Sequence, residues 1–340
     1  MSKSRSSGVT QKPASRLFAL RGRWGKAVAL LVLAAAIIVL SLFSGSAEIG
    51  MRRVLAALLG SADDAARSIV LDLRVPRLIA AFAVGSLLAL AGVLLQALFR
   101  NPLADPYVLG VSGGAAVGAV IALSLGAAQL LVQSSATAGA FLIMIIVYAL
   151  GRGGGTTRLL LIGVALASTC GALVTVLLTS ADATRVRGIV FWLAGDLGWV
   201  VNPVPTAFAA VVGTAAVVLL ARPLNVLAAG ELRARSVGLD FELWRLAVYV
   251  AAAVTTAIAV VSAGTVGFIG LVTPHAVRLL FRTSDHRIVA PASALLGGAV
   301  LAAADLCART IASPRQLPVG AITALVGAPA FVLLLRARAK

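Results

Sequence analysis

The sequence predicts an all-α protein that crosses a membrane about ten times. Hydrophobic residues make up 60% and charged residues 12% of its 340 residues, whereas soluble domains carry roughly 45–50% apolar and about 25% charged residues. The apolar residues gather in runs of about 20, the length at which a helix spans a bilayer. Basic residues stand at the ends of these runs. One soluble core cannot hide so much apolar surface, so the predicted class is a polytopic membrane protein.

Ten apolar runs are candidate spans, because a helix satisfies all of its backbone polar groups internally. They cover residues 27–43, 78–98, 107–125, 129–150, 159–180, 203–221, 243–263, 265–281, 288–307 and 319–335. The eighth run is short and contains Pro274, so its bounds are the least defined. The predicted organisation is a basic cytoplasmic tail over residues 1–26 and a transmembrane domain over residues 27–340.

The positions of the 29 Lys and Arg residues predict the orientation. Seven of them precede Ala27. With the N-terminus inside, twenty fall on the cytoplasmic side and nine on the outer side, the bias that the positive-inside rule associates with N-in and C-in topology. A cleaved signal peptide is the alternative for the first forty residues, but the run 27–43 exceeds the usual apolar region of roughly 7–15 residues. The outer segment 44–77 is long enough to hold helices or a docking surface.

Several functions are excluded by composition and spacing. The net charge of +17 lies at the ends of apolar segments and not on a polar face, so no nucleic-acid partner is expected. His275 and His286 lie near a cytoplasmic end, and Cys170 and Cys307, expected to be buried, have no partners at metal-ligand spacing. The sequence therefore predicts no catalytic residue, no metal site and no bound cofactor.

A glycine-rich turn, Gly151–Arg158, resembles a nucleotide-binding loop only superficially. It lacks the Gly-Lys-Ser/Thr ending that contacts phosphates. The chain is therefore predicted to carry no ATPase of its own and to act as a transport protein and not as an enzyme.

The remaining candidates are a carrier, a pore, or the membrane subunit of a pump driven by another protein. Acidic residues inside a membrane usually mark ion pathways, but here Asp305 is the nearest case, four residues from Arg309 near an outer end, where a structural ion pair is also predicted. The cytoplasmic loop 222–245 predicts two short amphipathic helices, separated at Gly230 and ended at Gly238. Such helices outside the bilayer are typical of a docking element.

Five motifs in order carry a family resemblance. They are RVPRLIAAFAVGSLLALAGVLLQALFRNPLADPYVLGVSGGAAVGA (74–119), TTRLLLIGVALAS (156–168), GELRARSVGLD (230–240), GTVGFIGLVTPHAVRLL (264–280) and LPVGAITALVGAPAFVLLL (317–335). With them the chain resembles the FecCD-type permease subunits of type II ABC importers for ferric siderophores, haem and vitamin B12. The resemblance implies a ten-helix permease in the cytoplasmic (inner) membrane.

The resemblance also implies partners. These are a dimer of ABC ATPase subunits that binds ATP and Mg, a periplasmic or lipid-anchored substrate-binding protein, and a second permease copy in a homodimer. The cargo would be an iron chelate, favoured slightly, or cobalamin. The alternative is an ion-coupled secondary transporter without an ATPase, and a membrane scaffold is a third class. The sequence favours the importer because the coupling loop has no evident use in either alternative.

The segment Arg100–Val120 is predicted to be a cytoplasmic turn followed by a tightly packed helix. Pro102 and Pro106 stop helices because they lack a backbone donor, and Asn101 and Asp105 can satisfy freed backbone groups locally. The small residues that would let neighbouring helices approach closely are Gly110, Gly113, Gly114 and Gly118.

The resemblance assigns roles to particular residues. The cytoplasmic gate would comprise Asn101, Leu103, Thr156 and Thr157, with helix capping as an alternative or additional role for the threonines. Coupling to the ATPase would involve Glu231, Arg233, Ala234, Arg235 and Gly238. Arg233 and Arg235 would pair with acidic groups of the partner, with a solvated charge run as the alternative. The binding protein would dock on Arg52, Arg53, Arg309 and Arg315, which otherwise are ordinary interfacial arginines. One departure is Gln316, where the family usually has Glu before Leu-Pro-x-Gly, and this puts a charge pair of the family in doubt.

Overall fold

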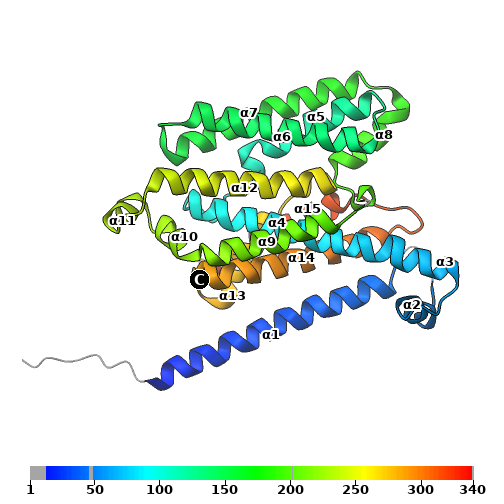
Figure 1. Ribbon diagram of the computed structural model, residues 1–340, viewed down its shortest axis with the longest axis horizontal. Coiled ribbons are helices and arrows are strands. Elements are labelled where there is room, and N and C mark those ends of the chain that lie inside the picture. The colour runs from blue at the N-terminus through cyan, green and yellow to red at the C-terminus, as the bar shows by residue number, and fades with distance from the viewer. Residues whose placement is uncertain (1–12, 46–48, 201, 339–340) are drawn as a thin grey trace, which may run out of the picture.

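The computed structural model describes residues 13–45, 49–200 and 202–338, and this part of the chain is helical throughout with no β-strand. Figure 1 shows the helices lying side by side along one direction. The long helices are α1 (Pro13–Phe43), α4 (Val75–Leu98), α6 (Gln129–Gly151), α7 (Gly155–Thr179), α12 (Phe241–Ala263), α14 (His286–Thr310) and α15 (Val319–Arg338). The shorter apolar helices are α5 (Val111–Ser124), α9 (Val204–Leu219) and α13 (Ile269–Phe281). The polytopic all-α class is therefore confirmed.

Each predicted apolar run coincides with one of these helices. Within the described residues, seven helical segments are long and apolar enough to cross a membrane, and α9 joined to α10 (Ala221–Ala228) through a 66° bend is an eighth candidate. The remaining two, α5 and α13, have 14 and 13 residues. At 1.5 Å per residue they are about 20 Å long, too short for a bilayer core of about 30 Å.

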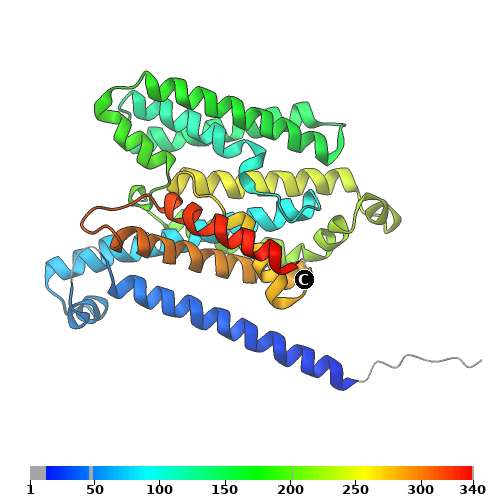
Figure 2. The same ribbon diagram turned by 180° about the vertical axis from the view of Figure 1, so that it is seen from behind.

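Both ends of the described chain lie at one end of the bundle. Figures 1 and 2 place the start of α1 and the C-terminus beside α10, α11 (Glu231–Ser236) and α13. This arrangement agrees with the even number of crossings and with N-in, C-in topology. The helix α1 runs unbroken through the predicted tail boundary at residues 26 and 27, and the basic residues Lys3, Arg5 and Lys12 lie outside the described residues.

The outer segment forms helices, as its length predicted. It contains α2 (Met51–Leu58), α3 (Asp64–Arg67) and a π-helical stretch, η1 (Ser68–Arg74), that continues directly into α4. Two further short elements, α8 (Ala183–Leu193) and the 3-10 turn η3 (Leu197–Trp199), follow α7 at the same end. The outer end is therefore rich in short helices, whereas α10 and α11 stand at the cytoplasmic end.

The helix α4 is the centre of the fold. Its most apolar 18-residue stretch is 89% buried, whereas the corresponding stretches of α1 and α7 are 17% buried. It packs on α14, α12, α9 and α13. Two glycines make this possible: a Cβ atom on Gly85 would overlap the carbonyl oxygen of Gly297 in α14, and one on Gly92 would overlap that of Gly270 in α13. In lipid the hydrophobic effect does not drive helices together. Helices associate there through close van der Waals packing, which small residues at such crossings allow.

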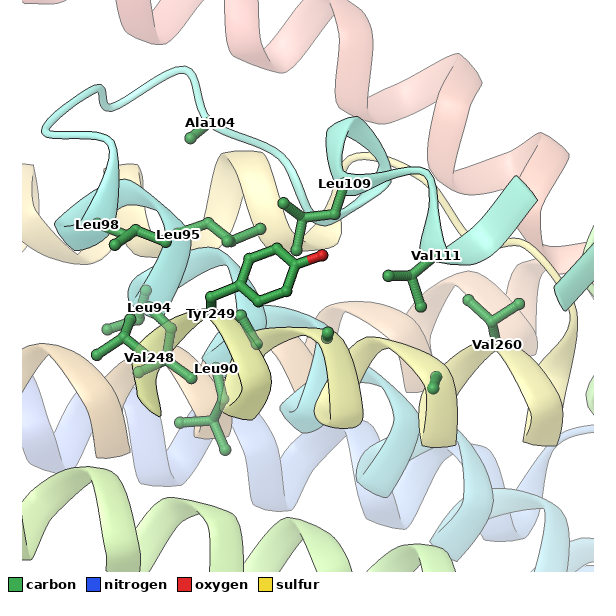
Figure 3. Packing of buried hydrophobic residues seen from close by; sticks show 14 of the residues in the cluster. Leu90, Leu94, Leu95, Leu98, Ala104, Leu109, Val111, Val248, Tyr249 and Val260 are labelled. Atoms are coloured by element: carbon green, nitrogen blue, oxygen red, sulfur yellow. The ribbon is translucent and has the colours of Figure 1, made fainter. Parts of the chain in front are cut away.

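A tyrosine anchors α12 against α4. The Tyr249 side chain is fully buried, and its hydroxyl donates a hydrogen bond to the Met144 carbonyl of α6 at 2.9 Å. Figure 3 shows its ring among Leu95, Leu109 and neighbouring apolar side chains. A phenol in this position combines apolar packing with a satisfied hydroxyl.

The helices α5, α6 and α7 form a separate packed group beside this centre. The predicted role of the glycines is confirmed: a Cβ atom on Gly114 would overlap Gly139, and one on Gly118 would overlap Ser135, both in α6. Gly113 faces Cys170 of α7, where a Cβ atom would lie 2.9 Å from the cysteine Cβ. The expected burial is confirmed for Cys170 but wrong for Cys307, which is exposed on α14 because it lies on the outward face of that helix.

Candidate functional site

In the turn after α4, side chains satisfy nearby backbone amides by hydrogen bonds, as the sequence predicted. The side-chain oxygen of Asn101 accepts a hydrogen bond from the Leu103 amide at 2.9 Å, and that of Asp105 accepts one from the Tyr107 amide at 2.9 Å. Asp105 thereby caps the 3-10 turn η2 (Pro106–Leu109), and Gly110 follows in a left-handed conformation with φ of +73°. This local bonding fixes the turn and leaves the Asn101 and Leu103 side chains exposed at its tip.

The other predicted gate residues lie at the start of α7. Thr156 and Thr157 occupy the first turn, and Gly154 is the N-cap residue with no side-chain cap. The capping alternative for the threonines is therefore wrong, because both lie inside the helix. Thr157 is exposed and Thr156 is half-buried. Among the described residues no hydrogen bond joins the threonines to Asn101 or Leu103.

Glycines connect the two parts of the candidate gate indirectly. The helix α7 packs on η2 where a Cβ atom on Gly163 would overlap the Val108 carbonyl oxygen, and one on Gly110 would lie 3.0 Å from the Gly163 carbonyl oxygen. The turn that presents Leu103 and the helix that presents Thr157 therefore share one tight backbone contact.

The predicted docking element consists of two short helices at the cytoplasmic end. Gly230, with φ of +108°, separates α10 from α11, and Gly238, with φ of +77°, follows α11. These positive φ angles explain why glycine stands at both positions. Ala234 is buried, whereas Leu232 and Val237 are 88% and 63% exposed. Large apolar side chains this exposed outside a membrane span are typical of a protein interface.

The two arginines of α11 differ in their contacts. Arg235 forms an ion pair with Glu231 one turn earlier, at 2.8 Å, so its charge is partly used within the helix. Arg233 is exposed and forms no ion pair among the described residues. The expectation that both arginines face acidic groups of a partner therefore fits Arg233 better than Arg235.

The docking element is joined to the membrane helices at two points. Asn225 of α10 donates to the Asp285 carboxylate at 2.8 Å, and its side-chain oxygen accepts from the His286 amide at 3.0 Å. Burial tends to raise the pKa of Asp285, but the hydrogen bonds from Asn225 and the Arg287 amide and the charge of Arg287 hold this pKa below its usual value. The carboxylate therefore stays charged and holds α10 on α14.

The second joint connects the docking element to the gate turn. Arg100, with φ of +50°, places its guanidinium against Gly230, where a Cβ atom would lie 2.9 Å from an arginine nitrogen. A displacement of α11 would therefore also displace Arg100, which directly precedes the gate residue Asn101.

The four predicted outer arginines have different surroundings. Arg52 and Arg53 on α2 are exposed, and so is Arg315. Arg53 lies 3.9 Å from Asp63, but both side chains are largely exposed, so the pair adds little stability. Arg309 is only 6% exposed and its guanidinium pairs with Asp305 at 2.9 Å. Arg309 therefore does not present a free guanidinium at the outer surface, and the predicted Asp305–Arg309 pair is confirmed.

The outer ion network contains residues that the sequence did not indicate. Arg77 of α4 donates to Asp305 at 2.9 Å and to the side-chain oxygen of Gln316 at 2.8 Å, and it lies 3.9 Å from Asp196. The neutral Gln316 therefore provides Arg77 with a hydrogen-bond acceptor. Arg77 lies 228 positions from Asp305, and no local spacing signals such a pair.

The described residues contain no group of three or more His, Cys, Asp or Glu side chains arranged to hold a metal ion. The polar groups gather instead at the two ends of the bundle, in the gate turn, the docking helices and the outer arginine network.

Comparisons with known proteins agree with this arrangement. The sequence model of the FecCD transport family matches residues 31–337. The chain is 45% identical over 281 residues to the cobalamin import system permease protein BtuC of Halobacterium salinarum, covering 81% of this chain and 75% of the relative. It is 41% identical over 275 residues to the vitamin B12 import system permease protein BtuC of Escherichia coli O9:H4, covering 79% and 84%.

Solved structures show the same fold. A metal-chelate type ABC transporter in an inward-facing conformation superposes with a TM-score of 0.82 at 29% identity, covering 91% of this chain and 98% of that one. The PsaBC complex from Streptococcus pneumoniae, at 18% identity and a TM-score of 0.54, supports the fold alone. The chain belongs to the FecCD transport family and is a multi-pass membrane permease of an ABC importer.

Proposed function

We propose that this permease imports a corrinoid of the vitamin B12 type. The observation that carries the proposal is the identity of 45% and 41% with two permeases named for cobalamin and vitamin B12 import. The sequence alone favoured an iron chelate slightly over cobalamin, and these relatives reverse that order. Both cargoes are bulky chelates that a binding protein would deliver whole, which is consistent with a chain whose described residues form no metal site.

The proposed assembly has two permease copies, two ATPase subunits that bind ATP and Mg, and one substrate-binding protein at the outer face. The exposed Leu232 and Val237 support ATPase docking on α11. The exposed Arg52, Arg53 and Arg315 support docking of the binding protein. Arg309 would act there only by holding Asp305 and the chain around it.

The helix α7 is the proposed lining of the transport path. Its most apolar stretch is only 17% buried, and the helix lies at the edge of the bundle opposite α1 (Figure 1). With 3.6 residues per turn, one exposed face carries Thr157 at the cytoplasmic end and then Ser168, Thr175 and Thr179. The hydroxyls of Ser168 and Thr175 bond to carbonyls of their own helix, at 3.1 and 3.0 Å. Such a face is mildly polar and offers no fixed charge that would retain a ligand.

The test is reconstitution with the cognate ATPase and binding protein in proteoliposomes. ATP-dependent uptake of cyanocobalamin is expected, with a ferric siderophore and haem measured in parallel. Uptake of the siderophore or haem in place of cyanocobalamin would overturn the corrinoid proposal but leave the importer intact.

The coupling role is tested in the same assay with charge reversals in α11. Glu231→Arg is expected to abolish uptake and to weaken ATPase co-purification. Because this change also breaks the pair with Arg235, the double variant Glu231→Arg/Arg235→Glu restores the ion pair with inverted positions. If the double variant recovers full uptake, Glu231 acts only on helix stability and the proposed contact with the ATPase is wrong.

A further inference from the structure

A polar cavity lies at the cytoplasmic end, where Arg100 and Pro102 of the gate turn form part of its wall. Its volume is about 500 Å³, and it is bounded by the ends of α4, α10 and α13 and the start of α14. Three arginines line it, Arg100, Arg278 and Arg282, and no carboxylate does. Among the described residues none of these arginines forms an ion pair. The cavity therefore concentrates positive charge that the chain does not neutralise.

A buried glutamine, Gln96, holds the guanidinium of Arg278 in place. Gln96 is buried, and its amide nitrogen lies 3.3 to 3.4 Å from the carbonyl oxygens of Ala104, Gly270 and Leu271. These acceptors fix the orientation of the amide, so its oxygen accepts a hydrogen bond from Arg278. An arginine fixed in this way retains its other donors for a ligand and loses little entropy on binding.

A buried histidine supplies a further polar position. His286 is 3% exposed and lines the cavity. Its Nδ1 lies 2.5 Å from the Asn225 side-chain oxygen, which can only accept, so Nδ1 donates. Its Nε2 is buried and has no hydrogen-bond partner in the described part of the chain. In the neutral ring this nitrogen is an acceptor, and it suits a hydroxyl group of a ligand.

The cavity lies beside exposed apolar side chains at the cytoplasmic end of the bundle, where we expect the membrane surface. Leu279, 36% exposed, is part of its wall, and the next residue, Leu280, is 40% exposed. Lys26 of α1 donates to the Leu280 carbonyl at 2.7 Å. Because the most apolar stretch of the peripheral helix α1 is only 17% buried, we expect this corner of the bundle to face lipid. Basic pockets between membrane helices on the cytoplasmic side bind anionic headgroups.

We propose that this cavity binds a phosphate group that carries or adjoins a hydroxyl. The arginines would hold the phosphate oxygens, for which the planar guanidinium is well matched, and His286 Nε2 would accept the hydroxyl. Two sources supply this chemistry: the headgroup of phosphatidylglycerol in the cytoplasmic leaflet, and hydrogen phosphate in solution. The cavity wall includes Ala228 at the end of α10, so a bound ligand would contact the base of the docking element. The proposal does not depend on which cargo is transported.

Lipid binding to the purified full-length chain tests the site, measured by native mass spectrometry. Titration with phosphatidylglycerol is expected to give one saturable adduct, and phosphatidylcholine none. Arg278→Gln and Arg282→Gln should each weaken the adduct about tenfold. Arg152→Gln, which removes an exposed cytoplasmic charge outside the cavity, should leave it unchanged. The thermal midpoint of each variant shows whether it is folded. Because Arg282 is exposed, its substitution is expected to disturb the fold less than that of Arg278.

Competition with inorganic phosphate separates the two sources. If phosphate displaces the lipid in the wild-type chain and binds on its own with the same dependence on Arg278, the site serves soluble phosphate. If phosphate does not compete, the site serves the lipid. Binding of either probe that is equal in Arg278→Gln, Arg282→Gln and Arg152→Gln would overturn the proposal.

Discussion

Arg77 and Asp305 meet at 2.9 Å although 228 positions separate them, and the same carboxylate holds Arg309 at 2.9 Å. Asp305 is 1% exposed. One buried carboxylate therefore compensates two guanidinium groups and ties the start of α4 to the outer end of α14.

Removing that carboxylate should destabilise the fold strongly. Asp305→Asn would leave the buried guanidinium of Arg309 and the half-buried one of Arg77 without their shared counter-charge, a loss of about 3–5 kcal/mol in the free energy of unfolding. Thermal unfolding of the detergent-solubilised protein measures it. Asp63→Asn is the matched control, because its pair with Arg53 is exposed on both sides and should contribute less than about 1 kcal/mol. Equal midpoints for the two variants would show that the network is not a stabilising element.

Gln316 should accept a change to the residue that is usual in the family. Its side-chain oxygen accepts from Arg77 at 2.8 Å, so Gln316→Glu converts a neutral acceptor into a charged one. We expect a gain of up to about 1 kcal/mol, because charge-assisted hydrogen bonds are roughly twice as strong as neutral ones. Gln316→Leu should lower the unfolding midpoint. The opposite order of the two variants would mean that the partly exposed glutamine does not support Arg77.

The crossing of α4 and α13 should not accept a methyl group. A Cβ atom on Gly92 would overlap the Gly270 carbonyl oxygen, so Gly92→Ala must push two backbones apart. We expect the free energy of unfolding to fall by about 1–3 kcal/mol, the usual cost of overpacking. Gly188→Ala in α8 is the control, because nothing lies within 4 Å of a Cβ atom there, and it should be neutral or stabilising by about 1 kcal/mol. Thermal unfolding of both variants checks the difference.

The two exposed faces of α7 should differ in their access to water. Ser168 lies on the same helix face as Thr157, whereas Leu173 is exposed on the other side of the helix. In a chain with Cys170 and Cys307 replaced by alanine, Ser168→Cys should react with a small water-soluble thiol reagent in proteoliposomes and Leu173→Cys should not. Comparable labelling of both cysteines would exclude the proposed lining.

Most of the fold was predictable because its signals are local. Runs of about twenty apolar residues predict the ten apolar helices, and Gly230 and Gly238 predict the limits of α11, where both glycines have positive φ angles. The start of α1 was missed by 14 residues, since Arg16, Arg21, Arg23 and Lys26 look like a solvated tail although the helix continues through them. Hydropathy detects the part of a helix inside the bilayer and not the helix itself.

The candidate sites were predictable only in part. The four-residue spacing of Asp305 and Arg309 predicted their pair, and the Asn and Asp of the gate turn predicted its backbone bonds. Arg77 could not be assigned to the same network, because its partners arrive from other helices. Likewise Gln96, Arg278 and His286 looked unrelated in the sequence, and only the packing of α4, α13 and α14 places them around one cavity.

The glycine crossings of α4 also determine which parts of the permease can move during transport. Gly85 against Gly297 and Gly92 against Gly270 bring backbone onto backbone, and such contacts cannot slide without separating the helices. We therefore expect α4, α13 and α14 to stay together as one unit during transport. The crossing of Gly163 in α7 with the Val108 carbonyl is equally close, so we expect α7 and the gate turn to move as a second unit when the path opens and closes.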